Sequence, residues 1–217
     1  MSENMLRELT QKEIIQVYEQ HLLRDFPPEE WKPLKQILNL VKEGSYQVYG
    51  FYEEDTLNAY AFLCSMKDEM FLDFFAVVAS AGDRCQSGQS RNGEAEFSRG
   101  QVYGRGRGYG SRALETLLQH IAERKKEVLI LEVEDPEQAE TRESFLLRNR
   151  RIQFYRRAGM DASSVYGQVM GVDFRILYYN LGKQQITDGE ISELLQAFYS
   201  KLYPQGDWSI TKKRPLS

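Results

Sequence analysis

The sequence predicts a mixed α/β (α+β) fold built mainly on an antiparallel sheet, and three observations support this prediction. Short stretches rich in aromatic and β-branched residues, separated by polar turns, fill residues 46–78. A glycine-rich loop ending at residue 110 leads directly into an amphipathic helix at 111–121. The apolar stretch at 127–134 has the composition of a strand buried on both faces. With 217 residues, 41% of them hydrophobic, the chain can form one large domain or one and a half.

The first half of the chain contains clear start and stop signals. Residues 5–9 are expected to form a strand. Thr10 and Glu13 make a capping-box pattern that starts a helix, and Pro27 and Pro28 end it. A second helix is expected over residues 29–43 and ends at Gly44. Three strands then follow as an antiparallel meander, at residues 46–52, 57–66 and 70–78.

The second half continues with alternating elements. The strand at 127–134 is followed by Asp135, which is expected to cap a helix with Pro136 at its first position. The remaining expected elements are a helix at 149–158 stopped by Gly159, a strand at 174–180, and a helix started by Thr187 and Glu190 that carries Ile191, Leu194, Leu195, Phe198 and Leu202.

One segment, residues 79–104, is polar, glycine-rich and without periodicity. Loops of this length are usually functional or linker-like. We expect an insertion that is disordered, with a lid that closes on a ligand as the alternative.

The loop Arg105-Gly-Arg-Gly-Tyr-Gly110 has the features of an anion-binding loop. Its glycines allow an anion to approach the backbone closely. The helix that starts at Ser111 offers free N–H groups, and its dipole favours negative charge at that end. The Walker A pattern fails because Ser111 follows Gly110 without a lysine. The dinucleotide pattern G-x-G-x-x-G fails because residues 109 and 111 are not glycine.

The remaining pattern, Arg105-x-x-Gly108-x-Gly110 before an amphipathic helix, resembles the acyl-CoA signature of the GNAT superfamily of N-acetyltransferases. Two alternatives stay open: an RNA-binding Gly-Arg tail and a purely structural glycine loop. The tail is disfavoured because the run leads straight into a core-facing pattern at Leu114, Leu117, Leu118 and Ile121.

The order of elements also resembles the GNAT fold, which implies a mixed, mostly antiparallel sheet flanked by helices on both faces. The resemblance covers residues 5–181. We therefore predict a GNAT-like domain at 1–181, with the insertion at 79–104, and a C-terminal helical extension at 182–217.

The resemblance implies an acetyl-CoA site. Main-chain groups of Phe75, Ala76 and Val77, at the end of a strand, would bind the pantetheine arm and offer an oxyanion donor. The diphosphate would lie on the loop and helix start, formed by Arg105, Gly106, Arg107, Gly108, Tyr109, Gly110 and Ser111. An ordinary buried strand is the alternative interpretation of residues 71–78.

A second motif, Arg150 to Met160, resembles the late family motif in which an Asn-bearing helix ends in a tyrosine. Tyr155 matches that tyrosine and would protonate the leaving thiolate. Asn149 would contact the cofactor, although it lies six residues before Tyr155, one fewer than the family spacing. The alternative for Tyr155 is a half-buried tyrosine with no catalytic part.

Direct transfer to an amine needs a proton acceptor, and three carboxylates are candidates. Glu132 and Glu134 lie two apart and so share a strand face, and Asp73 lies on a neighbouring strand. Glu132 is the first choice as base. A structural salt bridge to an arginine is the alternative for each.

The resemblance thus implies an acetyl-CoA-dependent N-acetyltransferase (an acyltransferase) acting on a small-molecule primary amine through a ternary complex. The alternative is a non-catalytic CoA-binding regulatory or scaffold module of the same fold. The acceptor and the oligomeric state stay open, with a homodimer as one option.

Composition excludes several other classes of protein. A net charge of −4 disfavours a nucleic-acid-coating protein. No apolar stretch of about 18 residues and no signal-peptide pattern occur, so we expect a cytoplasmic protein without a membrane partner. Two cysteines and two histidines without ligand spacing predict no metal site, and Cys64 is expected in the core.

Overall fold

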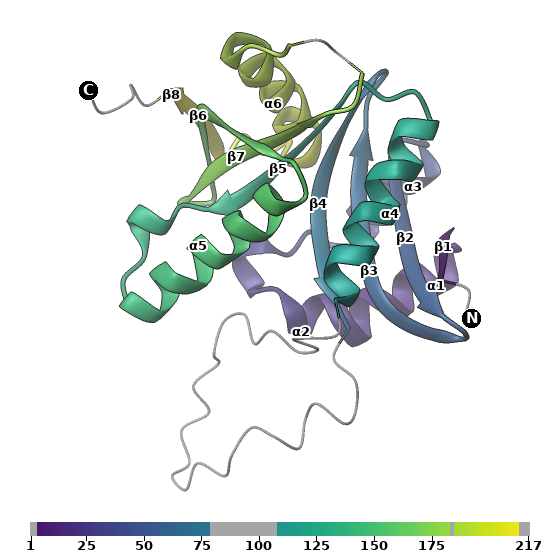
Figure 1. The fold of residues 1–217 in the computed structure, drawn as a ribbon. Helices are drawn as coiled ribbons and strands as arrows, with labels where there is room; N and C mark the ends of the chain where they lie inside the picture. The colour runs from purple at the N-terminus through teal and green to yellow at the C-terminus, as the bar shows by residue number, and fades with distance from the viewer. Residues whose placement is uncertain (1–3, 79–107, 183–184, 213–217) are drawn as a thin grey trace, which may run out of the picture. The chain divides into compact units, whose positions relative to one another are not determined.

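The strands of the protein form one eight-stranded sheet with the order β1-β2-β3-β4-β5-β7-β6-β8 (Figure 1). The structure is a computed structural model and describes residues 4–78, 108–182 and 185–212. The strands are β1 (Asn4–Glu8), β2 (Tyr46–Glu53), β3 (Thr56–Ser65), β4 (Glu69–Val77), β5 (Val128–Glu134), β6 (Asp161–Val169), β7 (Val172–Asn180) and β8 (Trp208–Lys212). β5 pairs with β4 in parallel and with β7 antiparallel, so the expected mixed, mostly antiparallel sheet is confirmed. The insertion predicted at 79–104 lies outside the described residues.

Helices separate the strands along the chain. They are α1 (Gln11–Val17), the π-helix η1 (Tyr18–Leu22), α2 (Leu23–Asp25), the 3₁₀-helix η2 (Pro28–Glu30), α3 (Leu34–Lys42), α4 (Tyr109–Glu123), the 3₁₀-helix η4 (Pro136–Gln138), α5 (Arg142–Arg157) and α6 (Asp188–Leu202). The chain divides into two compact units, 1–62 with 74–116, and 63–73 with 117–217. β3, β4 and α4 therefore contribute residues to both units.

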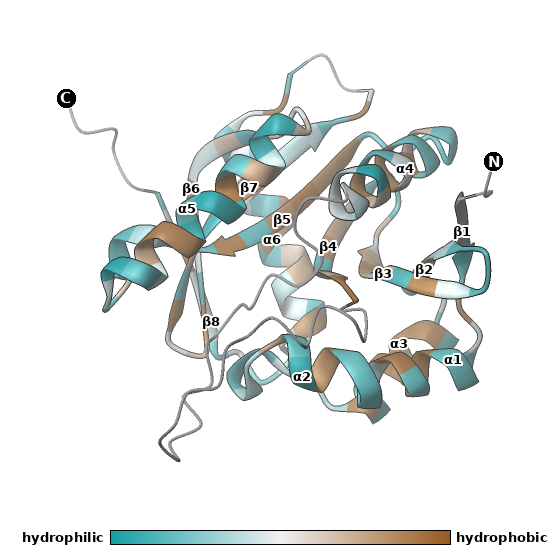
Figure 2. Ribbon diagram, turned by 60° about the horizontal axis from the view of Figure 1, so that its bottom comes forward, coloured by the Kyte–Doolittle hydropathy of each residue, from teal (hydrophilic) through white to brown (hydrophobic). Residues whose placement is uncertain are grey.

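The first unit holds β1, β2, most of β3, the end of β4 and the first turns of α4. α1 and α3 lie on one side of the strands β2 and β3, and the start of α4 lies on the other (Figure 2). α3 packs on β2 through Ile37 and Leu40, which are buried. At the start of α1, the Glu13 carboxylate accepts from both the backbone N–H and the hydroxyl of Thr10, at 2.9 and 2.6 Å. The predicted capping box is therefore confirmed.

The second unit holds the start of β4 and the strands β5 to β8. β8 pairs antiparallel with β6, so the C-terminal segment supplies both a helix and a sheet strand. α6 packs against β6 and β8 and buries five side chains: Ile191, Leu195, Phe198, Tyr199 and Leu202. Its start has the predicted capping box, since the Glu190 carboxylate accepts from the Thr187 N–H at 2.8 Å. The division at residue 181 remains a prediction about domain organisation.

Two expectations about helix boundaries need correction. The helix expected at 29–43 begins only at Leu34, because Pro33 disfavours a helical conformation at the residue before it. The helix expected at 149–158 begins at Arg142, where the Thr141 hydroxyl caps it by accepting from the Ser144 N–H. The strands β6 and β8 were not individually expected. The glycines placed as helix stops are confirmed: Gly44 and Gly159 have φ of 75° and 90°.

Candidate cofactor and catalytic site

Gly108 is the residue that starts α4. Its carbonyl oxygen accepts from the Arg112 N–H at 3.0 Å, which makes it the first acceptor of the helix, and its φ is +70°. Residues other than glycine rarely adopt this backbone conformation. A Cβ at this position would also lie 3.3 Å from the Arg112 guanidinium. The local geometry therefore explains why a glycine stands at this position.

The first turn of α4 carries backbone N–H donors and no acidic residue of its own. The first N–H groups of a helix have no partner within the helix, and its dipole favours an anion there. The Tyr109 hydroxyl donates to the Glu53 carboxylate at 3.0 Å and thereby ties the helix start to the end of β2. Residues 105–107 of the predicted cofactor loop lie outside the described residues.

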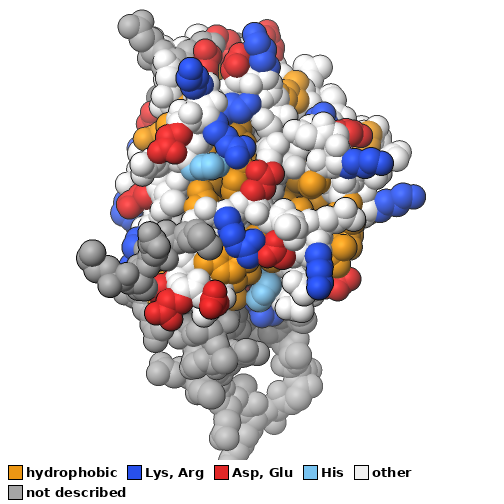
Figure 3. All heavy atoms as spheres, turned by 90° about the vertical axis from the view of Figure 1, so that its right-hand side faces the viewer, with side chains coloured by type: hydrophobic (Ala, Val, Ile, Leu, Met, Phe, Trp, Pro, Cys, Tyr) orange, Lys and Arg blue, Asp and Glu red, His pale blue; other side chains and the backbone are white. Residues whose placement is uncertain are grey.

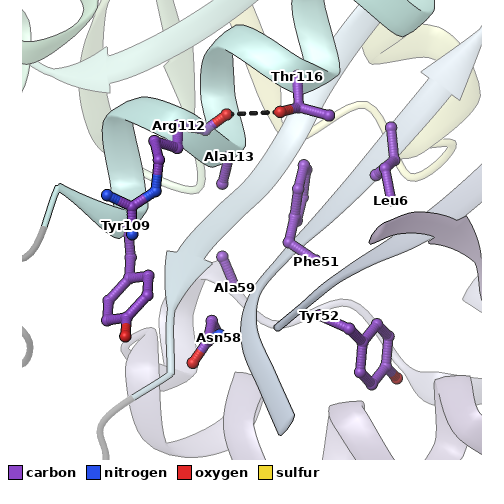
Figure 4. A pocket seen from close by; sticks show the side chains of 9 residues that line it. All are labelled: Leu6, Phe51, Tyr52, Asn58, Ala59, Tyr109, Arg112, Ala113 and Thr116. Atoms are coloured by element: carbon purple, nitrogen blue, oxygen red, sulfur yellow. Dashed lines mark hydrogen bonds between the residues drawn. The ribbon is translucent and has the colours of Figure 1, made fainter. Parts of the chain in front are cut away.

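Arg112, in the first turn of α4, borders a small open pocket (Figure 4). The guanidinium stacks on the Tyr109 ring at 4.8 Å from its centroid. The pocket lies between the first turns of α4 and the strands β1 to β3, and its lining residues are Leu6, Phe51, Tyr52, Asn58, Ala59, Tyr109, Arg112, Ala113 and Thr116. This lining is mostly apolar, with one cation and no carboxylate.

The end of β4 carries the second predicted part of the cofactor site. Residues Glu69–Leu72 pair with Val128–Leu131 of β5, and this register ends five residues before the end of β4. The tail contains Phe75, Ala76 and Val77, which are half-buried. The Phe75 ring meets the Phe51 ring edge to face at 6.2 Å. Backbone groups in a strand tail of this kind can bind a ligand chain instead of a neighbouring strand.

Glu134 forms ion pairs with arginines, which is the structural alternative to a catalytic role that the sequence analysis left open for it. Its carboxylate oxygens lie 2.9 Å from Arg148 and 3.8 Å from Arg151, both on α5. Arg148 also donates to the Asp135 carbonyl oxygen at 2.8 Å. Glu134 therefore connects β5 to α5, and this contact disfavours it as a base.

Glu132 has a different partner, which the sequence pattern did not reveal. The Tyr199 hydroxyl on α6 donates to its carboxylate at 2.5 Å. Burial raises the pKa of Tyr199 well above its usual value, and the charges of Glu132 and Asp73 raise it further. Asp73, Glu132 and Tyr199 therefore form one cluster in the second unit. The signal for Tyr199 was weak, since a tyrosine on the buried face of a helix looks like core.

Tyr155 lies in the helix that the late motif predicted, and it is 7% exposed. Burial raises the pKa of its phenol to about 12, and the charge of Arg151 partly opposes that rise. Its ring packs against Phe154. Asn149 donates its side-chain amide to the Phe145 carbonyl oxygen at 3.0 Å, within its own helix. The roles proposed for both residues remain predictions.

The predicted site residues thus divide by unit. Gly108 to Ser111 and Phe75 to Val77 lie in the first unit, and Asp73, Glu132, Glu134, Tyr155 and Asn149 lie in the second. Cys64 is buried, as expected.

On the face in Figure 3, basic and acidic side chains are interspersed, and hydrophobic side chains reach the surface between them. No group of three or more His, Cys, Asp or Glu residues in the described part is arranged to hold a metal ion. Within the same residues, no helix has the length and apolar character needed to cross a membrane.

Comparison with known proteins gives a likeness in structure. No protein-family model matches the sequence, and no curated protein matches it. The structure is similar to the ribosomal-protein-S18-alanine N-acetyltransferase of Escherichia coli, with a TM-score of 0.53 and 18% identity over 84% of this chain and 97% of that one. A Bacteroides thetaiotaomicron protein assigned to the GNAT family as an acetyltransferase gives a TM-score of 0.59 and 20% identity over 91% of this chain and 97% of that one.

A third similar structure contains the cofactor. It is yncA of Salmonella typhimurium, assigned as an acetyltransferase and solved with acetyl-CoA, with a TM-score of 0.52 and 13% identity over 86% of this chain and 99% of that one. Likeness at these identities is a likeness of fold. The strand order, the glycine-started helix α4 and these similar structures together show that the chain has the fold of the GNAT superfamily of N-acetyltransferases.

Proposed function

We propose that the protein is an acetyl-CoA-dependent N-acetyltransferase that transfers an acetyl group directly to a primary amine, most simply a small molecule. The observation that carries this proposal is the start of α4, where Gly108 at φ +70° precedes a helix turn with no acidic residue. A CoA diphosphate matches both the backbone N–H groups of a helix start and the positive end of the helix dipole.

The residues present fit acetyl-CoA in a second respect. The β4 tail at Phe75 to Val77 belongs to the same compact unit as the start of α4. We propose that its main-chain groups bind the pantetheine arm, and that one N–H stabilises the charge that develops on the acetyl oxygen. The cosubstrate supplies an acetyl thioester, whose carbonyl carbon the amine attacks.

The proton transfers are assigned to two residues of the second unit. Glu132 accepts a proton from the amine as the C–N bond forms, and Tyr155 donates a proton to the sulfur as the C–S bond breaks. Burial keeps the Tyr155 phenol protonated at neutral pH, but a pKa of about 12 also makes it a weaker acid than a free phenol. No covalent intermediate between enzyme and acetyl group is needed, and holding both reactants together supplies much of the rate.

Thiol release from acetyl-CoA, measured against a panel of small amines and short peptides, tests this proposal. We expect turnover with at least one amine and acetylation of that amine by mass spectrometry. Calorimetry with CoA is run in parallel. Binding of CoA without thiol release on any amine would instead support a regulatory or scaffold module of the same fold, and absence of CoA binding would exclude both.

A further inference from the structure

The hydroxyl of Tyr199 is held against Glu132 across a long separation in sequence. The two residues are 67 positions apart, and the phenol donates to the carboxylate oxygen Oε2 at 2.5 Å. Tyr199 is fully buried, with 0% of its surface exposed. Hydrogen bonds from a hydroxyl to a carboxylate at this length belong to the strong, charge-assisted class. This contact therefore restricts how the Glu132 carboxylate can turn.

The position of the phenol is itself fixed by packing. The Tyr199 ring meets three aromatic rings edge to face, those of Phe71 at 6.3 Å and of Tyr203 and Trp208 at 5.7 Å each. A Cβ at Gly167 would lie 2.0 Å from the Tyr199 hydroxyl oxygen, so only a glycine leaves room for it. The position of the Tyr199 hydroxyl oxygen is thus fixed by helix α6 together with the strands β4, β6 and β8.

The groups around this oxygen favour a phenol that keeps its proton. Glu132 and Asp73 occupy equivalent positions, each one residue beyond the last parallel pair Leu72–Leu131. Burial first, and then the charges of these two carboxylates and the nearby Tyr203, disfavour ionisation of Tyr199. The titratable groups that act on Tyr199 are thus Glu132 on β5, Asp73 on β4, and Tyr203, which directly follows α6. Tyr199 acts as a donor, and a hydrogen bond donated to a carboxylate favours its charged form.

We propose that Tyr199 is a positioning residue for Glu132, and that helix α6 is therefore part of the catalytic apparatus. This inference rests on the proposed function, in which Glu132 accepts the amine proton. During transfer the amine proton moves to Glu132, the C–N bond forms and the C–S bond breaks, while Tyr199 keeps its own proton. Its part is to hold the carboxylate ionised and correctly oriented.

The test begins with Tyr199→Phe, which preserves the ring and removes the hydroxyl. We expect single-turnover transfer to fall roughly 10- to 100-fold, because small misplacements of a reacting group have effects of this size. Affinity for CoA should be unchanged, and the acid limb of the kcat/KM profile should move to higher pH. A matched control is Tyr60→Phe, because the buried Tyr60 also donates to a carboxylate, that of Asp25, at 3.0 Å. The control should change neither the rate nor the pH profile.

A double-mutant cycle shows whether Tyr199 acts through Glu132. Glu132→Gln should abolish most turnover, and adding Tyr199→Phe should then have no further effect on the rate. An equal rate loss from Tyr199→Phe in both backgrounds, or an unmoved pH profile, would overturn the inference while leaving the proposed function intact. No thiol release by the unaltered protein on any amine would overturn both, and full activity in Glu132→Gln would overturn the role of Glu132 and with it that of Tyr199.

Gly167→Ala provides a second route to the same hydrogen bond if Tyr199→Phe fails to fold. Its methyl group would displace the Tyr199 hydroxyl without altering either partner. We expect it to reproduce the rate loss and the pH shift of Tyr199→Phe. Combining the two substitutions should restore part of the lost thermal stability, because phenylalanine lacks the atom that meets the methyl group most closely. An active Gly167→Ala variant with an unmoved pH profile would contradict the proposal.

Discussion

At the scale of single residues, the candidate site depends on backbone conformation and burial more than on charge. Gly108 and Gly171 both have positive φ, at 70° and 81°, but only Gly108 starts a helix. Tyr155 and Tyr199 are both buried phenols on helices of the second unit. Comparisons between chemically similar residues can therefore separate structural effects from functional ones.

Gly108→Val should abolish CoA binding, because a β-branched side chain is strained at this φ and keeps the backbone from the diphosphate. Isothermal calorimetry with CoA is the measurement. Gly171→Val imposes similar backbone strain in a turn of the second unit, where a Cβ would meet no atom within 4 Å. This control should lose stability but keep its CoA affinity. Unchanged affinity in a folded Gly108→Val protein would refute the cofactor assignment.

Tyr155→Phe should preserve the fold and CoA affinity and lower the transfer rate. Losing a general acid lowers rates about 10²- to 10⁴-fold, and the raised pKa of this phenol points to the lower end of that range. Single-turnover kinetics with saturating acetyl-CoA report the transfer step itself. Tyr60→Phe again serves as the control for loss of a buried hydroxyl. An undiminished transfer rate would remove Tyr155 from the mechanism.

At the scale of elements, local sequence signals located helix starts and stops better than they located strands of the second half. Capping boxes and stop glycines are complete within a few residues, so Thr10, Thr187 and Gly159 were predicted correctly. β6 was missed because its sequence mixes serines and glycine with few apolar residues. It becomes a strand through its pairing with β7 and β8, which single-chain propensity does not register.

The same limit applies to the candidate site. The glycine spacing around residue 108 is a local signal, and it identified the start of α4. The pairing of Glu132 with Tyr199 depends on tertiary packing across 67 residues and on space at Gly167. Nothing in the sequence near Glu132 indicates that a tyrosine 67 residues away packs against it, or that Gly167 leaves space for the phenol.

The cap of α1 should make the protein sensitive to acid. The Arg7 guanidinium, with help from Thr10, holds the pKa of Glu13 at about 2, below its usual 4.5. A depressed pKa contributes stability above the unfolded value, and that stability is lost as the pH falls from about 4.5 toward 2. Glu13→Gln should therefore show a flatter loss of stability across this window in urea unfolding. Glu19→Gln, at an exposed position of η1, should behave like the unaltered protein.

The turn between β6 and β7 offers a stabilising change. Met170 and Gly171 both have positive φ, as a two-residue type I′ turn requires, and the Met170 side chain is 52% exposed. Asparagine tolerates this conformation much better than methionine does. Met170→Asn should raise stability by roughly 0.5–1 kcal/mol, measured by thermal unfolding. A lower melting temperature would show that the methionine side chain packs in some way that its exposure does not suggest.

At the scale of the whole molecule, the C-terminal segment is an integral part of the second unit. α6 buries five apolar or aromatic side chains, and β8 covers the edge of β6. Burial of a large apolar side chain contributes about 1.5–3 kcal/mol, so five of them match the entire stability of a typical domain. A chain that ends at residue 181 should therefore fail to fold cooperatively, as judged by circular dichroism and size-exclusion chromatography. A stable, monomeric shortened protein would show that the segment is dispensable.

The separation between Glu132 and Tyr199 also sets an order of events during synthesis. The ribosome adds residues from the N-terminus onward, so β5 is made long before the helix that carries Tyr199. All residues of the first unit, which carries the proposed cofactor site, are therefore made while Glu132 still lacks its partner, 67 residues further along the chain. Under the proposed mechanism, acetyl transfer would begin only after α6 has emerged and docked. The molecule would bind its acyl donor early and become reactive late.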